Sequence, residues 1–285
     1  MQIADASTGA RCFQAMVAMR DGVRLNTFVY LPAVNSAGDA SSSHPVILQR
    51  TPYGIAMGQS AAMTDPVTGW LPDPDQPMRG SLLRGWKAIV EHGYAAVYQD
   101  TRGRYASEGE DRVYADDAND GYDTLAWIAA QPWCDENIGV SGSSAGATTA
   151  LAAASTGHPA VKAFWAQVGG SSIYDDVVCE GQSIEMERLW LWVAKNIPGL
   201  SQSHKEAVMR RSGASATDMD AAAASAAACY ERLDAASKAD PPFTGSPDWM
   251  ALPLTGHPDF TAWQPFLDDI ITHPTADDFR AAHNF

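Results

Sequence analysis

The pentapeptide Gly142-Ser143-Ser144-Ala145-Gly146 constrains the fold of this chain more than any other feature. It has the pattern G-x-S-x-G and stands between a run that predicts a strand (137–142) and an alanine-rich run that predicts a helix (144–155). A strand that turns so tightly into a helix leaves no room for side chains two residues before and two residues after the serine. The serine is then held at the carboxyl end of a sheet, over the N-terminus of a helix. The pattern therefore predicts that Ser144 is a nucleophile.

The first 172 residues alternate between strand-like and helix-like patterns. Residues 13–31 predict two strands joined by a turn at Arg20-Asp21-Gly22. This alternation is typical of a parallel sheet covered by helices, and the G-x-S-x-G pattern after the fifth strand indicates an α/β-hydrolase fold, incomplete, with about six strands. Beyond the hairpin, the predicted elements are strands 46–49, 94–100, 137–142 and 161–169 and helices 81–92, 116–131 and 144–155.

The pattern changes after Ser172, where no clear strand follows and three segments predict helices. These segments are residues 183–197, 205–211 and 219–239. We therefore expect two parts: residues 1–172 as the N-terminal part of an α/β-hydrolase domain, and residues 173–285 as a helical cap laid over the sheet.

Charge and cysteine content exclude several classes of function. With 19 basic and 34 acidic residues the formal net charge is −15, which disfavours nucleic acid and anionic membranes as partners. The four cysteines are widely spaced and form no Cys/His ligand motif, so we expect no metal and no disulfide scaffold. No secretory signal or membrane-spanning run is visible, and a soluble cytoplasmic protein without a cofactor is expected.

Several further segments resemble a known family. They are MRDGVRL (19–25), RTPYG (50–54), QDTRGRYASEGE (99–110), DTLAWIAAQPWCDENIGVSGSS (123–144), HPAVKA (158–163) and HPTADDF (273–279). In this order they resemble the α/β-hydrolases that include bacterial cocaine esterases, Xaa-Pro dipeptidyl-peptidases and α-amino-acid ester hydrolases. The resemblance implies that Ser144 is the nucleophile of an acyl-transfer reaction, with the Tyr53 hydroxyl and the Ala145 N–H as oxyanion donors.

The resemblance also bears on residues around the serine. Family members commonly have tyrosine directly after the nucleophile, where this chain has Ala145, so packing at the turn is expected to differ. Asp100-Thr101-Arg102-Gly103 is a family hallmark, and we interpret it as a brace for loops near the site. Asp175 and Asp176 begin the cap, where they would either bind a substrate ammonium group or remain solvated.

A nucleophilic serine needs a histidine base and a carboxylate to orient it. His158, His204, His257, His273 and His283 follow Ser144, but none follows a predicted core strand. The resemblance implies that the base and its acid lie downstream of the cap, so we expect this chain to be the N-terminal part of a larger hydrolase with its sixth strand as an exposed edge.

Two hypotheses therefore remain open. The first is a serine hydrolase that cleaves small ester or amide substrates or short peptides through an acyl-enzyme on Ser144. The second is a catalytically incompetent module that acts by binding, with a homo-oligomer paired along the sixth strand as one form of it.

Overall fold

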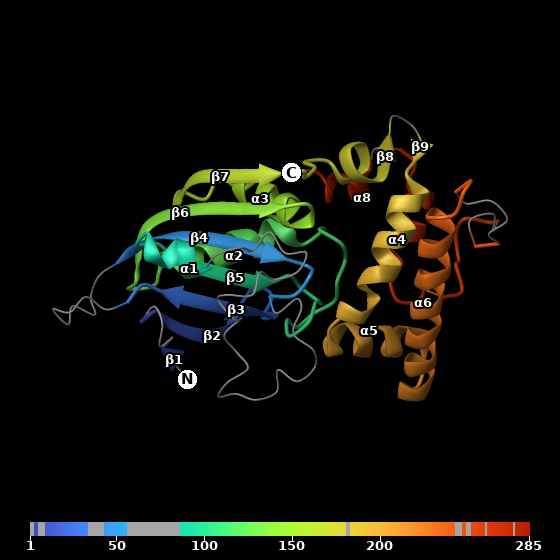
Figure 1. Ribbon diagram of the computed structural model, residues 1–285, viewed down its shortest axis with the longest axis horizontal. Helices are drawn as coiled ribbons and strands as arrows, with labels where there is room; N and C mark the ends of the chain where they lie inside the picture. The colour runs from blue at the N-terminus through green and yellow to red at the C-terminus, as the bar shows by residue number, and fades with distance from the viewer. Residues whose placement is uncertain are drawn as a thin grey trace.

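The computed structural model describes residues 3–4, 9–33, 43–55, 86–180, 183–242, 247–248, 252–259, 261–275 and 277–285. A twisted sheet with its covering helices forms one half of the molecule, and a group of helices from the second part of the chain forms the other (Figure 1). The helix predicted to start at Ser81 is described from Trp86 onward, and its first residues lie outside the described ranges.

The sheet contains seven strands in the order β1-β2-β3-β5-β4-β6-β7. The pair β2–β3 is the predicted antiparallel hairpin, β3 is antiparallel to β5, and the neighbours β5–β4, β4–β6 and β6–β7 are parallel. All six predicted strands are confirmed, and a two-residue strand β1 adds to them. The bounds are β1 Ile3–Ala4, β2 Arg11–Ala18, β3 Arg24–Leu31, β4 His44–Thr51, β5 Ala95–Asp100, β6 Cys134–Ser143 and β7 Val161–Gln167.

Helices cover both faces of this sheet because its central strands are apolar on both sides. Along β3, Val29 packs in one core with helices α2 (Asp117–Ala129) and α3 (Ala145–Ser155), whereas the adjacent Phe28 packs in a second core with α1 (Trp86–Glu91). Successive residues of a strand point to opposite faces, so the two cores lie on opposite sides of the sheet.

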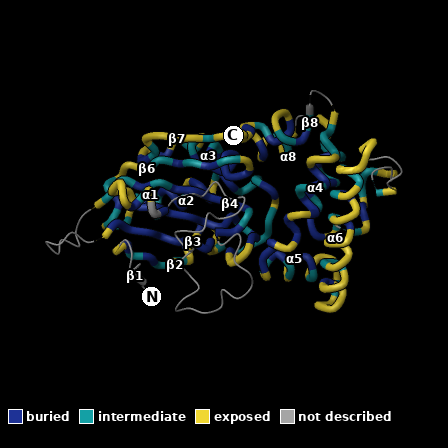
Figure 2. The backbone as a smooth tube through the Cα atoms, viewed as in Figure 1, coloured by how far each residue is buried: buried dark blue, intermediate teal, exposed yellow. Residues whose placement is uncertain are grey.

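Strand β7 is the last strand in the sheet order, and its side chains are largely exposed (Figure 2). Phe164 is 59% and Trp165 is 55% exposed, although both are large and apolar. The expectation of an exposed sixth predicted strand is therefore confirmed for the part of the chain that the structure describes.

The second half is mainly helical. Its core combines Trp190, Leu233, Trp263 and Phe266, all buried. Contrary to the expectation of no strand after residue 172, two short strands pair here, each too short to show an alternating pattern in the sequence. No helix within the described ranges is both long enough and apolar enough to cross a membrane. The elements are η1 Ile173–Val178, β8 Cys179–Glu180, β9 Ser183–Ile184, α4 Met186–Asn196, η2 Ile197–Gly199, α5 Gln202–Ser212, α6 Ala216–Ser237, α7 Phe266–Thr272 and α8 Asp278–Ala281.

The loop after β5 joins the two halves through Arg104, which is buried. Its Nε donates to the Pro52 carbonyl at 2.9 Å, and its Nη2 donates to the Asn196 carbonyl at the end of α4 at 2.8 Å. Beside it, the Tyr105 N–H donates to the Gly199 carbonyl at 2.8 Å. One buried guanidinium thus holds the loop that carries Tyr53 against the helical half.

Candidate active site

Ser144 lies at the tight turn between β6 and α3, as the pattern predicts. Its backbone has φ 54° and ψ −129°, a conformation that is strained for a residue with a side chain. A Cβ at Gly142 would lie 2.0 Å from the Gly146 carbonyl oxygen, so glycine is required there. A Cβ at Gly146 would lie 3.4 Å from the Arg50 carbonyl oxygen, which is an ordinary contact. The expected steric requirement is confirmed for Gly142 and is wrong for Gly146.

The exposed side chain of Ser144 faces the hydroxyl of Tyr53. Their oxygens, Oγ and Oη, are 3.4 Å apart. Trp192 of α4 donates from its Nε1 to the Tyr53 Oη at 3.0 Å. Because indole nitrogen only donates, the Tyr53 oxygen acts as acceptor in this bond and its own proton is left to point elsewhere. The Tyr53 hydroxyl is therefore available as a donor beside Ser144.

Ala145 is the first residue of α3 and is buried. The first N–H groups of a helix have no acceptor within the helix. The Ser144 carbonyl accepts from the Ala147 and Thr148 N–H groups, at 2.8 and 3.2 Å, which fixes the first turn. Close to this turn, a Cβ at Gly169 would lie 2.5 Å from the Ala147 Cβ. Small residues pack tightly around this turn.

A cavity of about 310 Å³ opens beside Ser144, between the sheet and the helical half. Ser144 and Ala145 line it from the sheet side. The opposite wall is mainly apolar and includes Ile173, Leu189, Trp192 and Phe266. A pocket of this size and composition suits a small, largely apolar ligand.

Asp175 and Asp176, at the start of the second half, differ in their position relative to the cavity. Asp176 lines the cavity, and its Oδ2 accepts from the N–H groups of Ser171 and Ser172 at 2.9 and 3.0 Å. These two hydrogen bonds hold the pKa of Asp176 below its ordinary value, and the bond from Ser172 has the larger effect. Asp175 is exposed, accepts from the Ser172 hydroxyl at 3.0 Å and is not among the residues that line the cavity.

Asp100 braces the loop that carries Tyr53. Its carboxylate is buried and accepts from the Ile55 N–H and from the Asn26 side chain, both at 2.8 Å. Burial raises the pKa of Asp100 to about 6, although the hydrogen bonds oppose this. Gly103 has φ +69°, and a Cβ there would lie 2.1 Å from the Asp111 nitrogen. These contacts agree with the interpretation of residues 100–103 as a brace.

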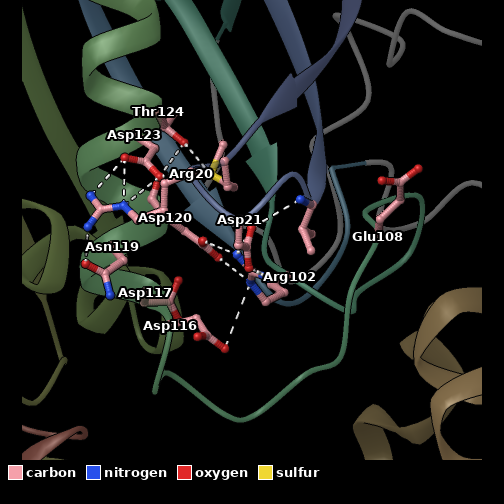
Figure 3. A network of polar contacts seen from close by, with 12 residues as sticks. Arg20, Asp21, Arg102, Glu108, Asp116, Asp117, Asn119, Asp120, Asp123 and Thr124 are labelled. Carbon is pink, nitrogen blue, oxygen red and sulfur yellow. Dashed lines mark hydrogen bonds and ion pairs between the residues drawn. The ribbon is translucent and has the colours of Figure 1, made fainter.

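Arg102 extends this brace to α2 and to the β2–β3 turn (Figure 3). It donates to both carboxylate oxygens of Asp120, at 3.0 and 2.6 Å, and to Asp21 at 2.7 Å. A second buried arginine, Arg50, lies beside the same helix with its Nη1 2.8 Å from the Asp117 Oδ1. Burial raises the pKa of Asp117 to about 7, and the charge of Arg50 opposes the rise.

No histidine within the described ranges has a hydrogen bond with Ser144. The five histidines considered from the sequence all have partners elsewhere. His158 accepts from the Ala160 N–H, His204 lies between the Asp111 N–H and the Trp263 carbonyl, His257 accepts from the Asp259 N–H, His273 contacts Asp277, and His283 donates to the Phe279 carbonyl.

Sequence reasoning missed Trp192. Large apolar residues at helical spacing usually belong to the core, as the buried Trp190 does. Two residues correspond to about 200° around a helix, so Trp192 lies on a different side of α4, where it is only partly buried against the same core and its indole nitrogen reaches Tyr53. The spacing Trp190-Leu191-Trp192 was the available signal.

Comparison with known proteins decides the family. A model of the X-Pro dipeptidyl-peptidase (S15) family matches residues 21–283. The chain belongs to this family. It is 36% identical over 193 residues to a cocaine esterase of Rhodococcus sp. (strain MB1 Bresler), which covers 67% of this chain and 29% of the esterase. The chain thus spans less than a third of that relative's length.

Two solved structures of hydrolases agree with this fold. An α-amino acid ester hydrolase is 27% identical with a TM-score of 0.50, over 67% of this chain and 31% of that protein. A CocE/NonD family hydrolase from Staphylococcus aureus, 24% identical over 71% of this chain and 36% of that one, has a TM-score of 0.54 and shows the shared fold. The α/β-hydrolase fold and the resemblance expected from the motifs are confirmed.

Proposed function

We propose that this S15 protein is a serine hydrolase that cleaves esters or amides through an acyl-enzyme on Ser144. In this reaction the Ser144 oxygen attacks the substrate carbonyl and loses its proton to a base, the alcohol or amine leaves, and water then releases the acid. The observation that carries the proposal is the strained, exposed Ser144 at the turn between β6 and α3, beside a cavity.

Two donors near Ser144 would stabilise the oxyanion. The Tyr53 hydroxyl is supported by its 3.4 Å approach to Ser144 and by the bond from Trp192, which directs its proton away from the indole. The Ala145 N–H is supported by its place in the first turn of α3. Donors fixed in advance act on charge that develops only in the transition state.

The cavity suggests the substrate class. Its apolar wall of Ile173, Leu189 and Phe266 would hold a small apolar acyl group of an ester, amide or short peptide. Asp176, which lines the cavity as a low-pKa carboxylate, would contact a substrate ammonium group, whereas Asp175 would not. We also propose that residues 1–172 and 173–285 act as two domains, the first supplying the reacting groups and the second this wall.

The reaction needs a base, and the described residues bring none to Ser144. The proposed activity therefore depends on a histidine and a carboxylate from outside them. The alternative, a binding module without catalysis, rests on the same observation.

A fluorophosphonate probe and an activated aryl ester test the proposal. In a form of the protein that supplies this histidine and carboxylate, we expect labelling at Ser144 and a burst of released phenol, both lost in Ser144→Ala. Ser143→Ala is the matched control, because it removes the neighbouring hydroxyl of the same motif and should retain both signals. An unchanged burst in Ser144→Ala would contradict the proposed acyl-enzyme mechanism. Treating the 285-residue chain by itself with the probe tests whether that chain contains a base. If Ser144 is not labelled, the result favours a binding module for that chain.

A further inference from the structure

A cluster of four metal-ligating side chains lies in the helical half. Cys229 comes from α6, and Asp248, His257 and Asp259 come from the segments between α6 and α7. One ligand atom from each lies within 4.8 Å of the others, and the Cys229 Sγ is 4.0 Å from the His257 Nε2. Cys229 is 0% and His257 is 9% exposed. None of the four lines the cavity beside Ser144.

Arg232 and Ser225 hold the two carboxylates in place. Arg232 donates to both oxygens of Asp248 at 3.0 Å and to the Asp259 Oδ2 at 2.9 Å, and the Ser225 hydroxyl donates to the Asp259 Oδ1. Carboxylate oxygens have more than one lone pair, so these bonds leave acceptor capacity for a metal. Hydrogen-bonded carboxylates of this kind are usual behind metal ligands, where the outer partners orient them.

The fixed charges of the cluster favour a cation. Two carboxylates and one guanidinium leave a net charge of about −1 while the Cys229 thiol keeps its proton. A divalent cation that replaces the thiol proton would bring the net charge of these groups to zero.

We propose that Cys229, Asp248, His257 and Asp259 bind one zinc ion. Thiolate and imidazole ligands favour zinc, whereas calcium and magnesium prefer oxygen ligands alone. On binding, the Sγ–H bond breaks, its proton passes to solvent, and the Sγ bonds to the metal. Tetrahedral zinc with bonds of about 2.0–2.3 Å places its ligand atoms roughly 3.3–3.8 Å apart, so the widest gaps in the cluster must close by about 1 Å.

The zinc would fasten Asp248, His257 and Asp259 to α6. His257 also packs edge-on against Trp190 of α4, with ring centroids 5.1 Å apart. Since α4 also carries Trp192, the metal would steady the helix that forms part of the cavity wall. Sequence analysis expected no metal because Cys229 and His257 are far apart along the chain, and the fold brings them together.

Titration of the chelator-treated chain with Co²⁺, a spectroscopic substitute for Zn²⁺, tests this proposal. We expect one equivalent to bind, with a thiolate-to-cobalt charge-transfer band and the strong visible absorption of a tetrahedral site. Zn²⁺ should displace the cobalt, and the thermal midpoint should rise with Zn²⁺.

Cys229→Ser should lose the charge-transfer band, and His257→Gln should keep that band while binding at least about tenfold more weakly. Cys179→Ser is the control, because it removes a different, half-buried thiol outside the cluster and should bind as the original chain does. The absence of a stoichiometric band in the unsubstituted chain overturns the proposal, whether or not any variant folds. A band that survives Cys229→Ser or is lost in Cys179→Ser overturns it as well.

Discussion

The two halves that meet at the cavity are held by different kinds of contact. On the sheet side, charged groups are buried: Arg50, Arg104, Asp100 and Asp117 are each at most 5% exposed. On the helical side the core is apolar, and ion pairs such as that of Lys238 with Asp234 lie at the surface. Figure 2 shows strands β3 and β4 buried and the outer face of α6 exposed.

The two kinds of contact suit different roles, which are precise positioning on the sheet side and tolerant packing on the helical side. Hydrogen bonds and buried ion pairs are directional, so they fix the positions of Tyr53 and Ser144 closely. Apolar contacts are not directional, and apolar surfaces tolerate replacement by side chains of similar volume. We therefore expect changes on the sheet side to affect the fold and the chemistry, and changes in the helical wall to affect mainly the choice of substrate.

The largest effect is expected from Gly142→Ala. The new methyl would lie 2.0 Å from the Gly146 carbonyl oxygen, and the backbone of the turn has no room to move away. We expect a loss of about 3 kcal/mol or more in the free energy of unfolding, measured by urea denaturation. Gly146→Ala is the matched change and should cost less than about 1 kcal/mol, because its methyl makes an ordinary contact. Equal losses of stability in the two variants would contradict the difference in steric requirement between Gly142 and Gly146.

The sequence predicted the parts of this picture that depend on local pattern. Short strand-like runs alternating with helix-like runs predicted the six strands, and the glycine spacing around Ser144 predicted the turn. The bond from Trp192 to Tyr53 could not be predicted, because it joins residues 139 positions apart. The ion pair of Arg50 with Asp117 and the cluster around Cys229 were missed for the same reason, since each forms only when distant segments pack together.

An intermediate effect concerns the buried carboxyl of Asp117. Its pKa in the folded chain is raised to about 7 by burial, so between about pH 4 and pH 7 the folded chain binds a proton that the unfolded chain has released. The free energy of unfolding should therefore fall as the pH rises through this window, by up to about 1.4 kcal/mol per pH unit from this group. Asp117→Asn should flatten the slope, as urea denaturation at several pH values would measure.

Asp123 on the same helix provides the opposite case. Burial opposes the shift, but the bonds from Arg20 hold the pKa of Asp123 below its ordinary value. Its stabilising effect is present above about pH 4 and is lost as the pH falls below that value. Asp123→Asn should leave the slope between pH 4 and pH 7 unchanged. An unaltered slope in Asp117→Asn would contradict the burial argument.

The smallest change in stability is expected from Trp192→Phe, which tests whether the helical half also serves the chemistry. Phenylalanine keeps an aromatic ring in the cavity wall but removes the bond to the Tyr53 Oη, so the free energy of unfolding should fall by about 1 kcal/mol. If this bond directs the Tyr53 proton toward the oxyanion, kcat should fall about tenfold, less than the roughly hundredfold loss expected for Tyr53→Phe.

In the Tyr53→Phe background, Trp192→Phe should change kcat little, because the hydroxyl that it orients is gone. Trp190→Phe, on the core side of α4, should lower stability without this dependence on Tyr53. An equal drop in kcat with and without the Tyr53 hydroxyl would show that Trp192 acts on the substrate pocket. The helical half would then affect only the choice of substrate, and the sheet half alone would supply the chemistry.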